Sequence, residues 1–80
     1  MEKQVKLIWD FRGPQSLQTA NHHEIHLKDY IAAEKLQEWK ITGVDKFSEM
    51  HNAAYWVVPE SKMMKFREIL KPHRATWYEE

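Results

Sequence analysis

The 80-residue sequence contains no cysteine, which excludes disulfide bonds, thiolate metal sites and cysteine nucleophiles. It also lacks any apolar run near the ~20 residues of a membrane span, and its N-terminus has no hydrophobic leader. We therefore expect a soluble, cytoplasmic protein with no membrane partner.

An excess of charge of one sign is also missing, because twelve Lys and Arg balance twelve Asp and Glu. Dedicated nucleic-acid binders usually carry a basic excess, so nucleic acid is not the expected partner. The 42% of apolar residues is too high for a disordered chain. The length predicts a single domain over residues 1–80. A domain of this size is marginally stable alone, and without disulfides its stability must come from good packing, a metal or a partner.

Glycine is scarce, with only Gly13 and Gly43 in the chain. No glycine-rich phosphate loop can be built from them, and no Ser/His/Asp nucleophile motif is present. The sequence thus contains no self-evident catalytic motif, and whether the protein is an enzyme stays open at this stage.

The first half of the chain predicts a strand and a long helix. Residues 3–11 alternate, with Val5, Leu7, Trp9 and Phe11 on one side and Lys6, Ile8, Asp10 and Arg12 on the other. After Gly13-Pro14, a segment from about residue 15 to residue 36 contains neither glycine nor proline. Its apolar stripe, Leu17, Ala20, Leu27 and Ile31, has helical spacing.

The second half predicts two strands, a helix and a last strand. Residues 40–58 have strand character, with Gly43 at a start or a bulge and a hairpin turn at Met50-His51-Asn52. The run AAYWVV is apolar on both parities, as in a central strand covered on both faces. Ser61 is the expected N-cap of the helix, Pro72 ends it, and residues 73–78 form the last strand. The buried stripe expected for this helix is Met63, Phe66, Ile69 and Leu70.

This order of elements, β-α-β-β-α-β, predicts an α+β two-layer sandwich. It resembles the ferredoxin-like (split βαβ) architecture, a four-stranded antiparallel sheet with two helices on one face. In this interpretation the first and third strands are central and run parallel to each other. RNA-recognition motifs share the order, but the third strand, AAYWVVPE, lacks their basic-glycine-aromatic pattern.

The sheet face without helices is expected to carry aromatic residues, which favours an interface or a ligand groove. The residues expected to make contact there are Ile8, Tyr55, Trp56, Val58 and Trp77, with Asp10 and Arg12 fixing the register or the orientation of a ligand. We expect a homodimer, formed by stacking two sheets or by pairing edge strands. The alternatives are a small-molecule ligand at this face, or a cover formed by a terminal tail or a loop.

Asp10 is expected to form an ion pair with Arg12 or Arg74. Otherwise Asp10 and Arg12, together with Tyr55 and His73, could rim a site for a small anion or for acid–base chemistry.

Three clustered histidines supply an alternative function. His22 and His26 are four residues apart, with Asp29 one turn further on, and this set could hold a divalent transition metal. On a helical wheel the set lies opposite the apolar stripe, which favours a solvated face. His23 flanks that stripe and Glu24 projects into it, so both side chains need partners or act as acid–base groups. The alternative is a dimeric metal-binding protein or acid–base enzyme that uses the three histidines with Asp10 or Glu24.

Overall fold

The computed structural model describes residues 2–78, which form one sheet with two α-helices. The elements in chain order are β1 (Gln4–Arg12), α1 (Ser16–Ala33), the 3-10 helix η1 (Gln37–Trp39), β2 (Thr42–Ser48), β3 (His51–Pro59), α2 (Glu60–Leu70) and β4 (Arg74–Tyr78). The predicted α+β class, with a four-stranded antiparallel sheet, is confirmed.

The strand order is β2-β3-β1-β4, so β1 and β3 are central and β2 and β4 form the edges. β1 and β3 pair antiparallel, and the predicted parallel arrangement of these strands is wrong. The reason lies in the connections. α1 carries the chain back along the sheet, so that β2 runs in the direction of β1, and the tight turn to β3 then reverses it.

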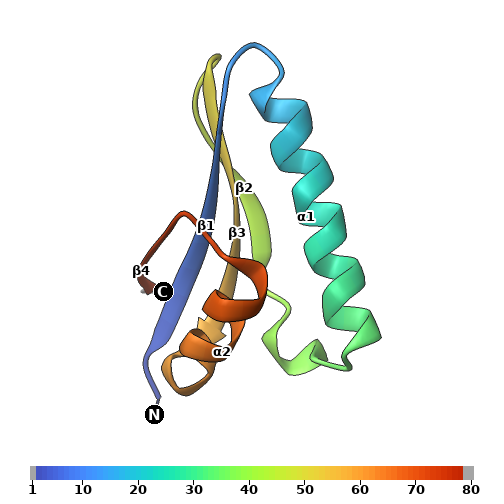
Figure 1. The fold of residues 1–80 in the computed structure, drawn as a ribbon, viewed down its shortest axis with the longest axis vertical. Helices are drawn as coiled ribbons and strands as arrows, with labels where there is room; N and C mark the ends of the chain where they lie inside the picture. The colour runs from blue at the N-terminus through green and yellow to red at the C-terminus, as the bar shows by residue number, and fades with distance from the viewer. Residues whose placement is uncertain (1, 79–80) are drawn as a thin grey trace.

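The core lies between the sheet and both helices (Figure 1). Its buried members are Val5, Leu7 and Trp9 of β1, Leu27 and Ile31 of α1, Ala54, Trp56 and Val58 of β3, and Phe66 of α2. The alternation expected for the first strand is therefore confirmed. The stripe expected for the first helix is confirmed at Ala20, Leu27 and Ile31, whereas Leu17 is only partly buried. In α2, Phe66 is buried, whereas Ile69 is half-exposed and does not join the core.

Several boundaries differ from the predictions. The β2–β3 turn is Glu49-Met50, so His51 lies within β3, and the bulge falls between Lys46 and Ser48. α2 begins at Glu60, directly after Pro59, and Ser61 is not its cap. The carboxylate of Glu2 instead accepts the Ser61 N–H at 2.7 Å. Neither α-helix combines the length and the apolar character that a membrane crossing requires.

Candidate functional site

The residues that we expected on the open sheet face are divided between the two sides of the sheet. Ile8, Asp10 and Tyr55 do lie on the helix-free face, where Ile8 pairs with Tyr55. Trp56 and Val58 lie on the helix-covered face and are completely buried. The prediction for these two residues is wrong, because a strand that is apolar on both parities does not reveal which side faces the helices.

The helix-free face is closed by its own side chains. Gly43 lies opposite Tyr55, and a Cβ at Gly43 would come within 2.5 Å of Tyr55 Oη, so the phenol ring rests directly on the glycine. Lys6 Nζ lies 4.2 Å from the centre of this ring and forms an ion pair with Asp45. A ring, an ammonium and a carboxylate thus span the three neighbouring strands.

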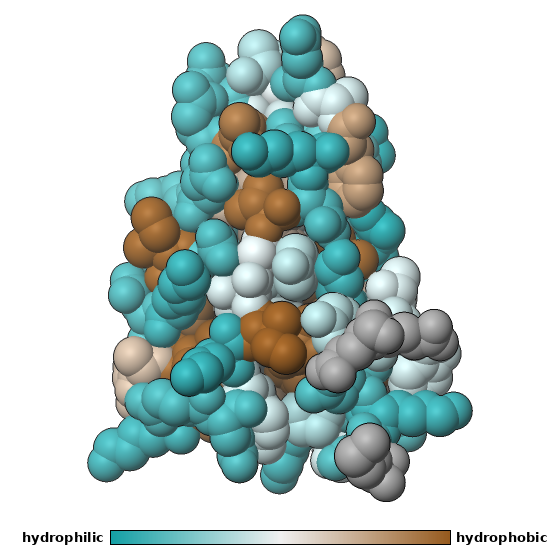
Figure 2. Space-filling model, turned by 180° about the vertical axis from the view of Figure 1, so that it is seen from behind, coloured by the Kyte–Doolittle hydropathy of each residue, from teal (hydrophilic) through white to brown (hydrophobic). Residues whose placement is uncertain are grey.

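Three apolar side chains of the sheet are buried on this face although no helix covers them. Ile8 is 3% exposed, Val57 1% exposed and Ala53 fully buried. Figure 2 shows this side of the molecule, with apolar residues along the middle and hydrophilic residues bordering them. A second sheet stacked here would have to displace the side chains that already provide the cover. Burial of apolar surface therefore gives little reason for sheet stacking.

Asp10 is the centre of a polar cluster on the same face. Its Oδ2 accepts a hydrogen bond from Arg74 Nε at 2.8 Å, and its Oδ1 lies 3.1 Å from Arg74 Nη2 and 2.8 Å from His51 Nε2. The Arg74 guanidinium holds the pKa of Asp10 at about 2, although burial of the carboxyl acts in the opposite direction. The predicted Asp10–Arg74 ion pair is confirmed, whereas Arg12 is exposed.

The cluster fastens the beginning of β4 to β1. The His51 ring packs on Phe47 with 4.7 Å between ring centres. On the far side of β1, the Asp10 N–H donates to His73 Nδ1 at 2.8 Å, and the His73 N–H donates to the Ile8 carbonyl at 2.9 Å. These bonds continue the β1–β4 connection beyond the last strand pair. An aspartate that orients a histidine is an arrangement suited to acid–base chemistry, and here the same side chain joins β1 to β3 through His51 and to β4 through Arg74.

The helix histidines form a pair rather than a larger set. His22 Nε2 and His26 Nε2 are 2.8 Å apart on the exposed side of α1. Within residues 2–78, no three His, Cys, Asp or Glu side chains come together in an arrangement that could hold a metal ion, so Asp29 does not complete the predicted set.

His23 and Glu24 lie on the inner side of α1, as their positions on the wheel indicate. The His23 ring lies 4.9 Å from Trp9 and 5.5 Å from Phe11, centre to centre, and its Nε2 is buried without a hydrogen-bond partner among the described residues. Burial lowers the pKa of His23, and the nearby histidines add to this effect. Glu24 accepts a hydrogen bond from the Thr42 hydroxyl at 3.0 Å. Neither side chain shares a site with Asp10.

The edge strand β4 carries the most exposed large apolar side chain of the described residues, Trp77, which is 59% exposed. The N–H of Gly13, the residue directly after β1, donates a hydrogen bond to the carbonyl of Met50, the last residue of the β2–β3 turn. In an antiparallel pair the backbone groups of alternate residues point to the same neighbour, so those of odd-numbered residues in β1 point toward β3. Even-numbered residues therefore face β4, where Lys6 pairs with Thr76. It follows that the N–H and C=O groups of Ala75 and Trp77 point away from the sheet.

The two edges of the sheet differ in how they are protected. β2 carries Asp45 and Lys46 and is interrupted by a bulge, three features that discourage pairing with another strand. The interior of β4 reads Ala75-Thr76-Trp77, with no charge, proline or glycine. β4 is the unprotected edge.

A groove runs between α2 and β4 on the helix side of the sheet. Its apolar part, a cavity of about 240 Å³, is lined by Val5, Met63, Ala75, Thr76 and Trp77. It continues past Met63 and Ala75 into a basic part of about 280 Å³, lined in addition by Arg67, Pro72, His73 and Arg74. We call these two parts the α2–β4 groove.

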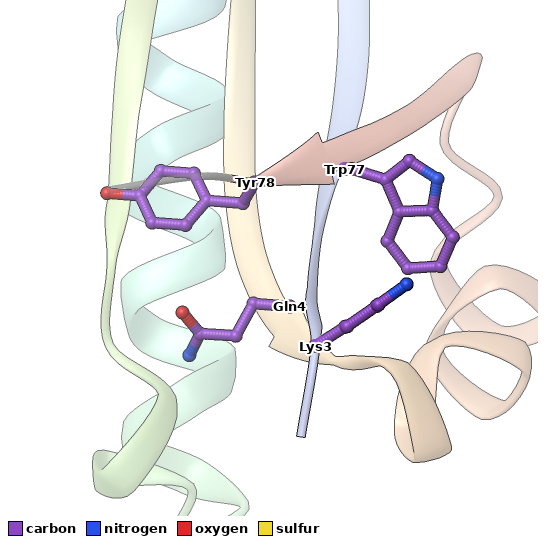
Figure 3. A pocket seen from close by; sticks show the side chains of 4 residues that line it. All are labelled: Lys3, Gln4, Trp77 and Tyr78. Atoms are coloured by element: carbon purple, nitrogen blue, oxygen red, sulfur yellow. The ribbon is translucent and has the colours of Figure 1, made fainter. Parts of the chain in front are cut away.

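At the other end of β4, Trp77 and Tyr78 point to opposite sides of the sheet (Figure 3). Lys3 reaches toward Trp77, with Nζ 5.3 Å from the ring centre, and Gln4 lies below Tyr78. Trp77 is thus exposed on the helix side of the sheet and does not belong to the helix-free face, so that part of its prediction is wrong.

Sequence reasoning missed His51, Gly43 and Arg67 as members of these sites. His51 was assigned to a turn, and its contact with Asp10 depends on a strand register that the sequence does not fix. Arg67 lies one helical turn after Met63, which was expected in the buried stripe, and this spacing could have placed it at the border of the groove.

Comparison with known proteins adds no further information about the site. No family model matches the chain, and no curated protein or solved structure matches it significantly.

Proposed function

We propose that the chain is a small interaction domain of ferredoxin-like architecture that forms a homodimer by pairing the β4 strands of two copies. The central position of β1 and β3, the edge position of β2 and β4, and the two helices on one face support this architecture. The observation that carries the homodimer is the unprotected edge of β4 with Trp77 exposed on it.

Antiparallel pairing of two identical strands suggests one register. Ala75 and Trp77 have outward-pointing backbone groups, so these residues must exchange hydrogen bonds with the partner. When Thr76 lies on the two-fold axis, Ala75 of each copy pairs with Trp77 of the other, and both hydrogen-bonded pairs form. The eight strands then make one continuous sheet, with all four helices on the same side.

The side chains support this register. It places the large Trp77 ring opposite the small Ala75 side chain, at the mouth of the apolar part of the α2–β4 groove, beside Met63. Each copy supplies both the ring and the groove, as a two-fold interface requires. An interface built on a five-residue edge is small, so we expect a dimer that dissociates upon dilution.

Ala75→Pro tests the pairing without breaking the fold. Proline removes an N–H that points outward, and edge strands tolerate proline at such positions. We expect a monomer in sedimentation velocity, with a melting temperature near that of the parent protein. Thr76→Pro is the matched control, because it removes an N–H that β1 uses and should lower the melting temperature. Two results contradict the proposal. One is a parent protein that stays monomeric at about 100 μM, a concentration on the order of the Kd of weak specific complexes. The other is an Ala75→Pro variant that still dimerises.

A second candidate function, metal binding by the helix histidines, is supported by the 2.8 Å between His22 Nε2 and His26 Nε2. Two neighbouring ligands at ~2.1 Å from a six-coordinate ion lie about 3.0 Å apart, so the pair could chelate a divalent transition metal. Titration with Ni²⁺ should show one site that His26→Ala removes and that Asp29→Asn leaves intact. Equal binding by the parent protein and His26→Ala contradicts this function.

A further inference from the structure

Arg67 brings an uncompensated charge to the basic part of the α2–β4 groove. It is exposed on α2 and forms no ion pair with any described residue. Arg74 lines the same part, but its guanidinium is already paired with Asp10. No carboxylate is among the described residues that line either part of the groove. The lining therefore offers one positive charge that is available to a ligand.

His73 adds a hydrogen-bond donor to the same cavity. Its Nδ1 accepts the Asp10 N–H at 2.8 Å, so the ring is neutral and carries its hydrogen on Nε2. This leaves the Nε2–H group for another acceptor. A guanidinium and an imidazole N–H on one cavity are suited to an oxyanion.

The C-terminal end of α2 lies beside this cavity, and free carbonyl groups at a helix end disfavour an anion. Two of these carbonyls are occupied. The Arg67 carbonyl accepts the Lys71 N–H at 2.9 Å, and the Leu70 carbonyl accepts the Trp9 indole N–H at 3.0 Å. The Arg67 guanidinium carries a full positive charge, whereas a helix end carries about half a unit of the opposite sign. The basic part therefore favours a single negative charge.

The basic and the apolar part form one groove, because Met63 and Ala75 line both. Trp77 lines the apolar part alone, so its ring lies at the end of the groove away from Arg67, on the side of α2 (Figure 3). Cavities of about 240 and 280 Å³ together reach the size of small-molecule sites. A ligand that fills both needs an acidic group at one end and an apolar tail at the other.

We propose that the α2–β4 groove binds a small amphipathic carboxylate, with its carboxylate at Arg67 and His73. Its apolar tail lies along Met63 toward Trp77. A carboxylate matches the planar fork of a guanidinium with two parallel hydrogen bonds. A phosphate monoester carries nearly two charges at pH 7, which exceeds the one that the groove offers. All of these residues belong to one protomer, so the site does not require the proposed homodimer.

Hexanoate is the probe, and two-dimensional NMR of the isotope-labelled protein follows its binding. We expect saturable shifts of the Ala75 and Thr76 amides and of the Trp77 indole N–H, with a Kd on the order of 1 mM. Each buried methylene tightens binding about fourfold, so hexanoate should bind about tenfold more tightly than butanoate. Hexanamide has the same shape without the charge and should bind about tenfold more weakly than hexanoate. Equal Kd values for hexanoate and hexanamide, or for hexanoate and butanoate, overturn the proposal.

Arg67→Gln should weaken the binding of hexanoate about tenfold and leave that of hexanamide unchanged, because it removes the charge alone. Lys62→Gln is the matched control, since Lys62 is exposed on the same helix and lines neither part of the groove. It should bind hexanoate like the parent protein, and both variants should melt near the temperature of the parent protein. An equal loss of affinity in the two variants would show general attraction to a basic surface and overturns the assigned site. The same holds if hexanoate shifts none of the three reporter signals.

Discussion

Replacement of Asp10 by Asn tests the polar cluster that fastens β4 to β1. Asp10→Asn keeps the shape of the side chain and removes the charge that Arg74 and His51 contact. The Arg74 guanidinium lowers the Asp10 pKa from 3.8 to about 2. This difference corresponds to roughly 2 kcal/mol, and screening at the 44% exposed Arg74 side chain reduces the expected loss to about 1–2 kcal/mol.

The loss is measured as the free energy of unfolding in urea at pH 7. For a domain of this size, 1 kcal/mol changes the melting temperature by about 4–8 °C, so thermal unfolding gives an independent check. Asp29→Asn is the control, since Asp29 is exposed on α1 and forms no ion pair with any described residue. It should unfold like the parent protein.

The pH dependence supplies the refuting result. The folded-state pKa of Asp10 lies below that of an unfolded aspartate, so the ionised carboxylate stabilises the folded state fully above about pH 4. This stabilisation is lost as the pH falls toward 2. The difference between the parent protein and Asp10→Asn should shrink over the same range. Equal stability at pH 7, or a difference that stays constant down to pH 2.5, refutes the role assigned to the cluster.

Two further changes test other contacts. Gly43→Ala would place a Cβ 2.5 Å from Tyr55 Oη, so the ring would have to move away from the strand, and we expect the free energy of unfolding in urea to fall by about 1–3 kcal/mol. In a Tyr55→Ala background the same substitution should have no such effect, and an equal loss there contradicts the assigned clash. His23→Gln tests the histidine beside Trp9, whose lowered pKa means that protonation favours the unfolded state. The melting temperature of the parent protein should fall as the pH falls below about 6.5, and that of the variant should fall less. An equal fall in both proteins between pH 7.5 and pH 5 contradicts this.

Elements that are covered on one side could be predicted from the sequence. The alternation around Leu7 and the stripe through Leu27 each have one buried side, and the period of the pattern therefore shows both the element and its orientation. The run AAYWVV was predicted as a strand, but Ala53 and Val57 are buried on the helix-free face as completely as Trp56 is on the other. A strand that is equally apolar on both sides does not show which side faces the helices, and this explains the misplacement of Trp56.

Contacts within the site could be predicted only where the strands are close in the chain, or where one side chain requires a partner of a particular charge. Asp10 in a central strand requires a cation, and Arg74 on the last strand was one of two candidates. The contact with His51 depends on the register of β1 with β3 and on a turn that begins one residue earlier and ends two residues earlier than we expected. The closure of the helix-free face depends on Tyr55 lying on Gly43, a three-dimensional fit that no local pattern reports.

The fastening cluster and the proposed interface are connected through β4. This strand pairs with β1 over residues 74–78, and Arg74 and His73 anchor its beginning. Removal of the Asp10 charge should loosen that end of β4 and so weaken the dimer as well as the fold. Ile31→Val is the matched control, because it destabilises the core at α1 by about 1 kcal/mol without touching β4. Sedimentation velocity should give a weaker dimer for Asp10→Asn than for Ile31→Val at equal stability. Equal dimer affinity of these two variants would show that the cluster stabilises the protomer alone.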